Sequence, residues 1–250
     1  MPKDTTPGKP TTRRYSPEEK AAAVRMVRTL RVELGTEHGT IQRVAQQQGY
    51  GTESVRSWVR QADIDEGHQP GLSTADVWVT DLTFVPTWAG IAYVCFIINV
   101  YSRTIVGWRV ASHMRTTMVL DSIEMARWSR GTQLTGLRCH SDAGSQFTSI
   151  RYGERLAEIG AVPSIGTVGD SYDNALAETV NGYYKAELIR GPARDGRPWK
   201  TVEDVELATL SWVHWHNNER HGYLNDVPPA EFEETFYARS RTDQPLVGIQ

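Results

Sequence analysis

Three apolar runs joined by short turns constrain the fold of this chain most strongly. Residues 77–85, 91–100 and 105–110 are rich in β-branched and aromatic side chains, which is typical of strands. Only residues 86–90 and 101–104 connect them, and parallel neighbours would need a much longer crossover. The sequence therefore predicts a meander of three antiparallel strands.

Helical and strand-like patterns alternate after the meander. They are expected at residues 116–130 (helix), 137–140 (strand), 149–159 (helix), 162–165 (strand) and, after a loop over 166–174, from about Ala175 (helix). Three antiparallel strands followed by α-β-α-β-α is the element order of a ribonuclease H-like fold, an α/β mixed sheet flanked by helices. Two later helices are expected at 202–216 and 229–237.

The N-terminal part has a different, all-helical pattern. Ser16, Pro17 and Glu19 form a capping-box start for a first helix that buries Ala23, Val24, Val27 and either Leu30 or Leu34. A short helix after Thr40, a glycine turn at 49–51 and a third helix capped by Thr52 complete a helix-turn-helix plan. The outward residues of the third helix that we expect to contact DNA are Ser54, Arg56, Arg60 and Gln61. The alternative is a small packing module with a solvated polar face.

These patterns predict five segments along the chain. They are a disordered basic tail (1–14), a helix-turn-helix DNA-binding domain (15–62), a linker (63–75), a ribonuclease H-like catalytic domain (76–240) and a C-terminal tail (241–250).

Three acids stand at informative places in the predicted catalytic domain. Asp81 lies between apolar neighbours of the first strand, where a bare charge is costly to bury. Asp142 follows the fourth strand, which lies beside the first in this fold, and Glu178 is expected in the first turn of the helix after the fifth strand. Such a trio suits two Mg²⁺ (or Mn²⁺) ions, which prefer oxygen ligands and can assist in-line displacement at a phosphodiester. We therefore predict Asp81, Asp142 and Glu178 as both metal ligands and catalytic residues.

Other polar residues nearby have two interpretations. Lys185 lies two helical turns after Glu178, with Asn181 between them, so both are expected to contact DNA unless they are simply solvated. His214, His216 and His221 suggest zinc, but His214 and His216 point to different faces of a helix and no Cys is near, so packing is the favoured interpretation.

Charge, cysteine content and hydropathy narrow the class of protein. The first 60 residues hold 11 Lys/Arg against 6 Asp/Glu, which suits a phosphate backbone, whereas the other 190 hold 16 against 24. Cys95 and Cys139 both lie in strand-like segments and are expected to be buried free thiols of a reducing compartment. No apolar run is long enough to cross a bilayer, so we expect a cytoplasmic protein without a membrane partner.

The motifs from Trp78 to about Tyr237 resemble a known family. WVTDLTFVPTW, CHSDAGSQF and GDSYDNALAETVNGYYKAEL are similar to the integrase-like core of bacterial insertion-sequence transposases made from two overlapping reading frames. The resemblance implies Asp81, Asp142 and Glu178 as the metal-binding triad, and insertion-sequence terminal repeats and target DNA as partners of a homo-oligomer assembled on DNA. Residues 15–70 resemble the helix-turn-helix start of the upstream frame's product.

The chain departs from this family in one respect. A leucine-zipper helix and an intermediate region normally separate the two parts, whereas here residues 70–74 lead almost directly into the first strand and no heptad stretch is present. We interpret the chain as an internally deleted fusion of an end-recognition head and a catalytic core. A DNA transposase is the expected function; the alternatives are a catalytically silent protein that occupies element ends and inhibits transposition, and a ribonuclease H-type nuclease.

Overall fold

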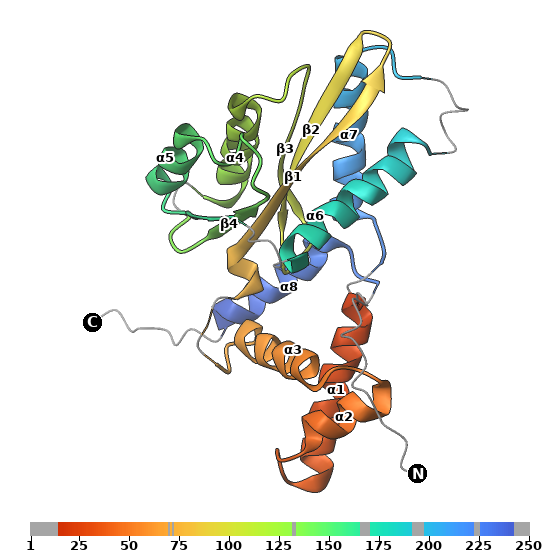
Figure 1. The fold of residues 1–250 in the computed structure, drawn as a ribbon, viewed down its shortest axis with the longest axis vertical. Coiled ribbons are helices and arrows are strands. Elements are labelled where there is room, and N and C mark those ends of the chain that lie inside the picture. Colours follow the sequence, from red (N-terminus) through yellow and green to blue (C-terminus); the bar gives the residue numbers. More distant parts are fainter. Residues whose placement is uncertain are drawn as a thin grey trace, which may run out of the picture. The chain divides into compact units, whose positions relative to one another are not determined.

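A computed structural model describes residues 15–69, 71, 73–131, 134–165, 171–191, 198–222 and 226–242. The chain divides into two compact units, Met1–Gly71 and Leu72–Gln250 (Figure 1), which we call the head and the core. The expected tail over residues 1–14 and most of the expected tail over residues 241–250 lie outside the described residues.

The head contains three helices, α1 (Pro17–Leu34), α2 (Thr40–Gln48) and α3 (Thr52–Asp65). Ser16 caps α1 through the expected capping box with Glu19, and Gly49 ends α2 in the left-handed conformation with a φ of 69°. Buried Val, Ala and Trp side chains from all three helices form one apolar cluster, which Leu30 joins while Leu34 stays exposed. Helix α3 continues through Asp65, three residues into the segment expected as linker, because Gln61 and Asp65 share a hydrogen bond one turn apart.

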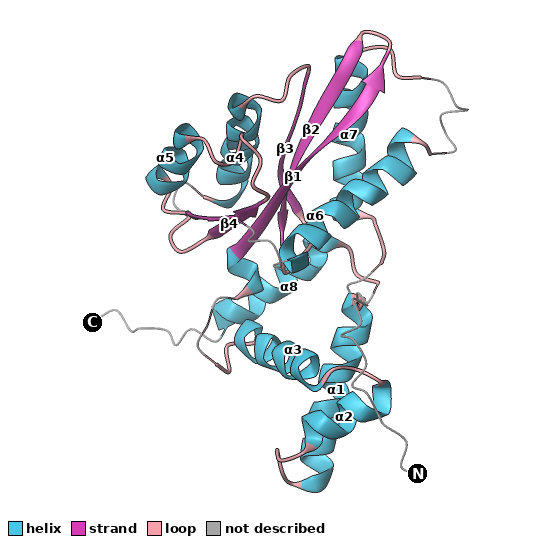
Figure 2. Cartoon of the chain, viewed as in Figure 1, coloured by secondary structure: helices cyan, strands magenta, loops and turns pink. Residues whose placement is uncertain are grey.

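Five strands form the sheet of the core in the order β3-β2-β1-β4-β5. They are β1 (Val77–Thr87), β2 (Gly90–Asn99), β3 (Ile105–Ala111), β4 (Arg138–Ser141) and β5 (Val162–Ile165). Strand β2 is antiparallel to both of its neighbours, β1 and β3, whereas β1, β4 and β5 are parallel (Figure 2). The meander and the position of β4 beside β1 are therefore confirmed.

Helices cover both faces of this sheet. Helices α4 (Thr116–Arg130) and α5 (Ile150–Glu158) share one apolar cluster with the sheet, and α6 (Ser171–Tyr183) and α7 (Val202–Asn218) share the other. The last helix is α8 (Pro229–Thr242). The alternation of side chains along the strands explains these two clusters, because Trp78 enters the first and the neighbouring Val79 enters the second.

The region around α6 differs from the expectation. This helix begins at Ser171 instead of near Ala175, because Asp and Asn are as typical of the first turn of a helix as of a loop. Glu178 therefore lies in the interior of α6 and not in its first turn. After Tyr183 the helix continues as a π-helical segment, η2 (Tyr184–Ile189), which changes the spacing of side chains before Lys185.

Both cysteines are free and buried, as expected. Burial raises the pKa of Cys95 to about 11 and that of Cys139 to about 12, so both thiols are protonated at neutral pH.

Within the described residues, no helix is long and apolar enough to span a membrane.

Candidate catalytic site

The register of β1 and β4 brings two of the three acids together. The two strands are parallel, and their last paired residues are Thr80 and Ser141. Asp81, still within β1, and Asp142, directly after β4, are the next residues on the two strands, so they lie side by side at the end of β4. Adjacent strands lie about 4.8 Å apart, which makes the two acids neighbours.

Asp81 is held in place by two hydrogen-bond donors. The backbone N–H of Leu82 donates to Oδ1 at 2.7 Å, and the amide Nδ2 of Asn181 donates to Oδ2 at 3.0 Å. Burial raises the pKa of the Asp81 carboxyl, and the carboxylates of Asp142 and Glu178 raise it further, while the two donors act in the opposite direction. Asp81 is therefore electrostatically coupled to both of the other acids.

Asp142 lies in a tight loop directly after β4. Its Oδ1 accepts the backbone N–H of Gly144 at 3.0 Å, and a Cβ on Gly144 would lie 2.9 Å from that same oxygen. The buried Gln146 donates to the carbonyl of Met114 at 3.1 Å, which ties the loop to the segment before α4. The residues around Asp142 thus shape the loop and leave the carboxylate exposed.

Helix α6 supplies the third acid. Asn181 is one turn after Glu178 on this helix, so the hydrogen bond from Asn181 to Asp81 also sets Glu178 beside Asp81. Asn181 is only 7% exposed, and its Oδ1 is buried without a hydrogen-bond partner. The amide of Asn181 therefore contacts Asp81, and the expected DNA contact of this residue stays a prediction.

The donor set of the site suits hard divalent cations. Three carboxylates repel one another around Asp81, and a cation shared between two of them would relieve that repulsion. Among the described residues, no three His, Cys, Asp or Glu side chains are close enough together to hold one ion. That three carboxylates hold metal ions here therefore stays a prediction, supported by the electrostatic effect of Asp142 and Glu178 on Asp81.

Lys185 lies next to the site, in η2. Its Nζ is 5.4 Å from the centre of the Phe84 ring, and Phe84 is three residues after Asp81 on β1. No sequence pattern singled out Phe84 on β1. For Trp88, the available signal was an aromatic residue in the turn between two strands.

The histidines of α7 have separate surroundings. His216 is buried and its Nε2 lies 3.2 Å from the carbonyl of Arg103, whereas His214 contacts the side chain of Asn218 on the exposed side. Arg220, shortly after α7, donates to Glu187 and stacks on Tyr183.

In the head, the side chains of α3 divide as the sequence indicated. Val55, Trp58 and Val59 are buried, while Arg56 and Arg60 are exposed and Ser54 and Gln61 are half-buried. Arg56 is paired with Glu53 one turn earlier.

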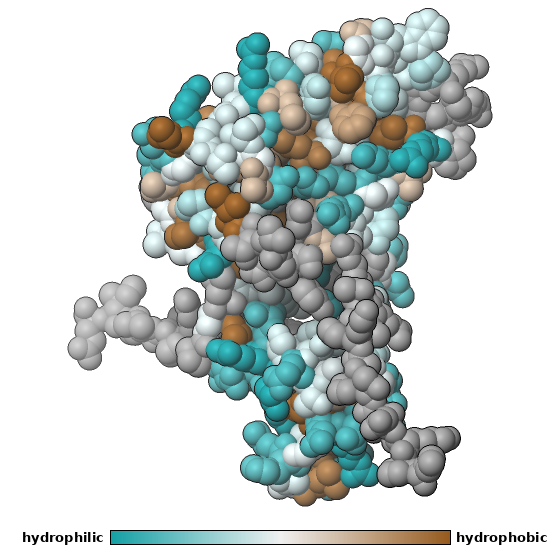
Figure 3. Space-filling model, in the orientation of Figure 1, coloured by the Kyte–Doolittle hydropathy of each residue, from teal (hydrophilic) through white to brown (hydrophobic). Residues whose placement is uncertain are grey.

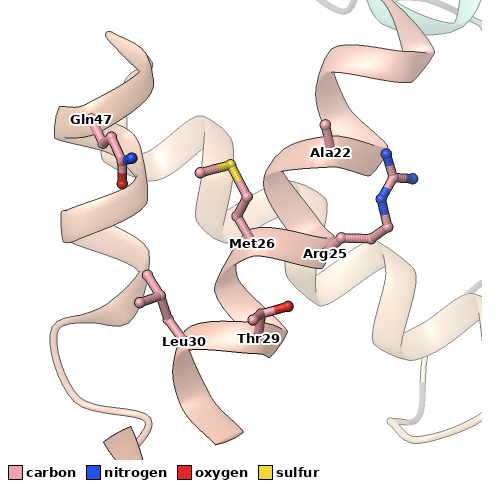
Figure 4. A pocket seen from close by; sticks show the side chains of 6 residues that line it. All are labelled: Ala22, Arg25, Met26, Thr29, Leu30 and Gln47. Carbon is pink, nitrogen blue, oxygen red and sulfur yellow. The ribbon is translucent and has the colours of Figure 1, made fainter. Parts of the chain in front are cut away.

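A separate groove of about 540 Å³ runs between α1 and α2 (Figure 4). Its lining is Ala22, Arg25, Met26, Thr29, Leu30 and Gln47. No acid lines this groove, so it does not resemble the carboxylate site.

Two overlapping stretches of the core match a protein family. Residues 73–171 and 160–229 each match the family described as Integrase core domain. Among solved structures, the chain is similar to the simian T-cell lymphotropic virus intasome (TM-score 0.53, 12% identity, covering 72% of this chain and 59% of that one). It is also similar to the HTLV-2 integrase catalytic core in complex with magnesium, trimeric form (TM-score 0.50, 16% identity, covering 65% and 99%). The core therefore has the ribonuclease H-like fold of the integrase cores, and the chain belongs to the integrase core family.

Sequence relatives narrow the class further. A protein of Mycobacterium tuberculosis assigned as the transposase of insertion element IS986/IS6110 is 56% identical over 177 residues, covering 69% of this chain and 62% of that protein. The IS629 transposase of Shigella sonnei is 50% identical over 168 residues, covering 67% and 54%. The IS904 transposase of Lactococcus lactis is 35% identical over 158 residues, covering 63% and 61%. The chain groups with the insertion-sequence transposases, and it spans somewhat more than half the length of these relatives.

Proposed function

We propose that this chain is a DNA transposase that cleaves phosphodiester bonds at the ends of an insertion sequence and transfers the resulting strand to target DNA. The observation that carries the proposal is the side-by-side position of Asp81 on β1 and Asp142 at the end of β4, with Glu178 acting electrostatically on Asp81. The similarity of the core to insertion-sequence transposases supports DNA as the substrate.

The residues of the site have separate roles in this proposal. Asp81, Asp142 and Glu178 would hold two Mg²⁺ (or Mn²⁺) ions, which when bound favour the attacking oxygen and stabilise the leaving oxygen of an in-line displacement. Asn181 and the backbone N–H of Leu82 fix the Asp81 carboxylate, and Gly144 fixes that of Asp142. The chain's own contribution is thus positioning and electrostatics. A neighbour in fold, the HTLV-2 integrase core, is described as a complex with magnesium.

The head supplies DNA binding in the same proposal. The exposed Arg56 and Arg60 of α3, with Ser54 and Gln61 beside them, would contact the terminal repeats of the element. Lys185 would contact a phosphate close to the carboxylates. Assembly of several copies on DNA would bring two ends and the target together.

Substitution of the three acids tests the catalytic part. Asp81→Asn, Asp142→Asn and Glu178→Gln should each lower Mg²⁺-dependent nicking and strand transfer by about 10³-fold or more, because each removes a charged ligand at the reacting phosphate. The assay uses the DNA ends that flank the gene of this chain, and circular dichroism confirms that each variant is folded. Asp121→Asn is the matched control, since Asp121 is an exposed acid of α4 next to Arg109.

Two results would contradict the proposal. Metal-dependent cleavage that survives in the three variants would show that these acids are not catalytic. Specific end binding by the unaltered chain, with no nicking in either Mg²⁺ or Mn²⁺, would favour the silent inhibitor; cleavage of RNA–DNA hybrids alone would favour a ribonuclease H-type nuclease.

A further inference from the structure

The hairpin of β1 and β2 exposes aromatic rings beside the carboxylate site. Strand β1 pairs with β4 only as far as Thr80, and β2 pairs with β3 only as far as Tyr93, which lies opposite Phe84. Beyond Phe84, β1 and β2 continue as a two-stranded hairpin (Figure 2). Phe84 on this hairpin is 56% exposed, and Trp88 at its tip is 79% exposed. Elsewhere on the face shown in Figure 3, exposed apolar residues are interspersed among polar ones.

The backbone of the hairpin tip is fixed although the ring of Trp88 is free of packing. The hydroxyl of Thr87 donates to the carbonyl of Gly90 at 2.9 Å, which closes the turn. The N–H groups of Trp88 and Ala89 donate to the carbonyls of Trp199 and Lys200 at 2.9 and 3.0 Å. An indole this exposed contributes little to the stability of the fold, so the tip presents a large aromatic surface on a rigid support.

A lysine residue lies near each of the two rings. The Nζ of Lys185 lies 5.4 Å from the ring centre of Phe84. Lys200 is exposed and belongs to the segment that pairs with the tip through the Trp88 and Ala89 backbone. Aromatic rings next to cations along a backbone path are the features that bind single-stranded nucleic acid, where each ring stacks on a base.

The rings also continue the line of the catalytic strand. Phe84 and Trp88 follow Asp81 by three and seven residues, which corresponds to roughly 10 and 23 Å along an extended strand. Because side chains alternate along β1, Phe84 projects from the face opposite to Asp81. A DNA strand that reaches both the carboxylates and the rings would pass the side of β1 that has no partner strand after Thr80. Paired bases are stacked on one another in a duplex and offer no free face, so such a surface acts on unpaired bases.

We propose that Phe84 and Trp88 form a stacking surface for unpaired bases of the DNA strand that enters the carboxylate site. This inference rests on the proposed function, because it takes DNA as the substrate of that site. Stacking on aromatic rings tolerates any base, so the surface holds a frayed or single-stranded DNA end without reading its sequence.

Binding to two matched DNA probes tests this inference. The probes are one short duplex with blunt ends and the same duplex with a single-stranded extension, and fluorescence anisotropy is measured on the full chain in Ca²⁺ to prevent turnover. The extension should improve binding by the unaltered chain. Trp88→Ala and Phe84→Ala should each weaken binding of the extended probe by about 5- to 100-fold and leave the blunt probe unchanged.

Trp128→Ala is the matched control, because Trp128 is 74% exposed on α4, outside the hairpin. This variant should bind both probes as the unaltered chain does. Equal binding of the two probes by the unaltered chain, unchanged binding in Trp88→Ala and Phe84→Ala, or equal losses for both probes would each overturn the inference. Asp81→Asn separates it from the proposed function, because that variant should keep the preference for the extended probe while it loses cleavage. Normal cleavage in Asp81→Asn would contradict the catalytic assignment. The comparison of the two probes would then still decide whether Phe84 and Trp88 bind unpaired bases.

Discussion

At the scale of single residues, burial decides the chemistry of His216. The side chain is 2% exposed, its ring packs 5.0 Å from that of Trp212, and its Nδ1 has no hydrogen-bond partner. Burial lowers the pKa of His216 to about 4, although the Arg103 carbonyl favours the protonated form. The imidazole is therefore neutral in the folded core at physiological pH and packs against Trp212.

The low pKa of His216 predicts an acid-sensitive core. An unfolded His has a pKa near 6.5, so between about pH 6.5 and 4 the unfolded chain binds a proton that the folded chain does not. Stability is fully present above pH 6.5 and falls as the pH is lowered, by about 3 kcal/mol from this residue alone. Urea unfolding at a series of pH values should show a smaller loss in His216→Gln than in the unaltered chain. His214→Gln, at an exposed position of the same helix, is the control, and an unchanged pH profile in His216→Gln would contradict the assignment.

At the scale of elements, the packing of β3 on α4 depends on one glycine. A Cβ at Gly107 would lie 2.3 Å from the carbonyl oxygen of Ser122 and 2.9 Å from the Cβ of Ala126. The backbone of α4 cannot move away easily, because Met118, Val119 and Ile123 anchor this helix in the core. Gly107 therefore sets how closely the helix approaches the sheet.

Substitution of two glycines should change stability in opposite directions. Gly107→Ala should lower the free energy of unfolding by about 3 kcal/mol, since the strand and helix must separate. Gly153→Ala, in the interior of α5 with nothing within 4 Å of the added methyl group, should raise it by about 0.5–1 kcal/mol. Chemical denaturation measures both values, and a Gly107→Ala variant as stable as the unaltered chain would show that the approach of α4 is adjustable.

The same elements show how far sequence patterns predict the structure. Periodicity and short turns are local signals, so they predict the strands of the meander, the parallel β4 and most helices. The π-helical segment after Tyr183 and the partner of Asn181 could not be predicted, since both depend on contacts between residues far apart in the chain. The candidate acids could be selected from the sequence because Asp81 lies on a strand, Asp142 directly after a strand and Glu178 on a helix; their joint catalytic role stays a prediction. Trp88 has no local pattern that separates an exposed ring from a packed one.

At the scale of the whole molecule, the chain joins a head and a core that have separate apolar clusters. Helix α3 ends at Asp65 and the next regular element, a short 3₁₀ turn, begins at Thr74. The described residues between them contain no helix and therefore no zipper that could pair two copies. If the chain carries out the proposed transposition, two element ends have to meet in one complex, and we expect DNA to bring the copies together.

This requirement predicts an assembly that depends on DNA. Light scattering coupled to size exclusion should give a monomer mass for the free chain and a mass of two or more copies once DNA carrying an element end is added. Arg56→Ala combined with Arg60→Ala should reduce this assembly, because both exposed side chains of α3 would lose their phosphate or base contacts. Asp81→Asn should assemble normally, since its loss affects catalysis only. A stable multimer without DNA would show that the chain has another association surface and would contradict the interpretation that the assembly function was lost with the zipper.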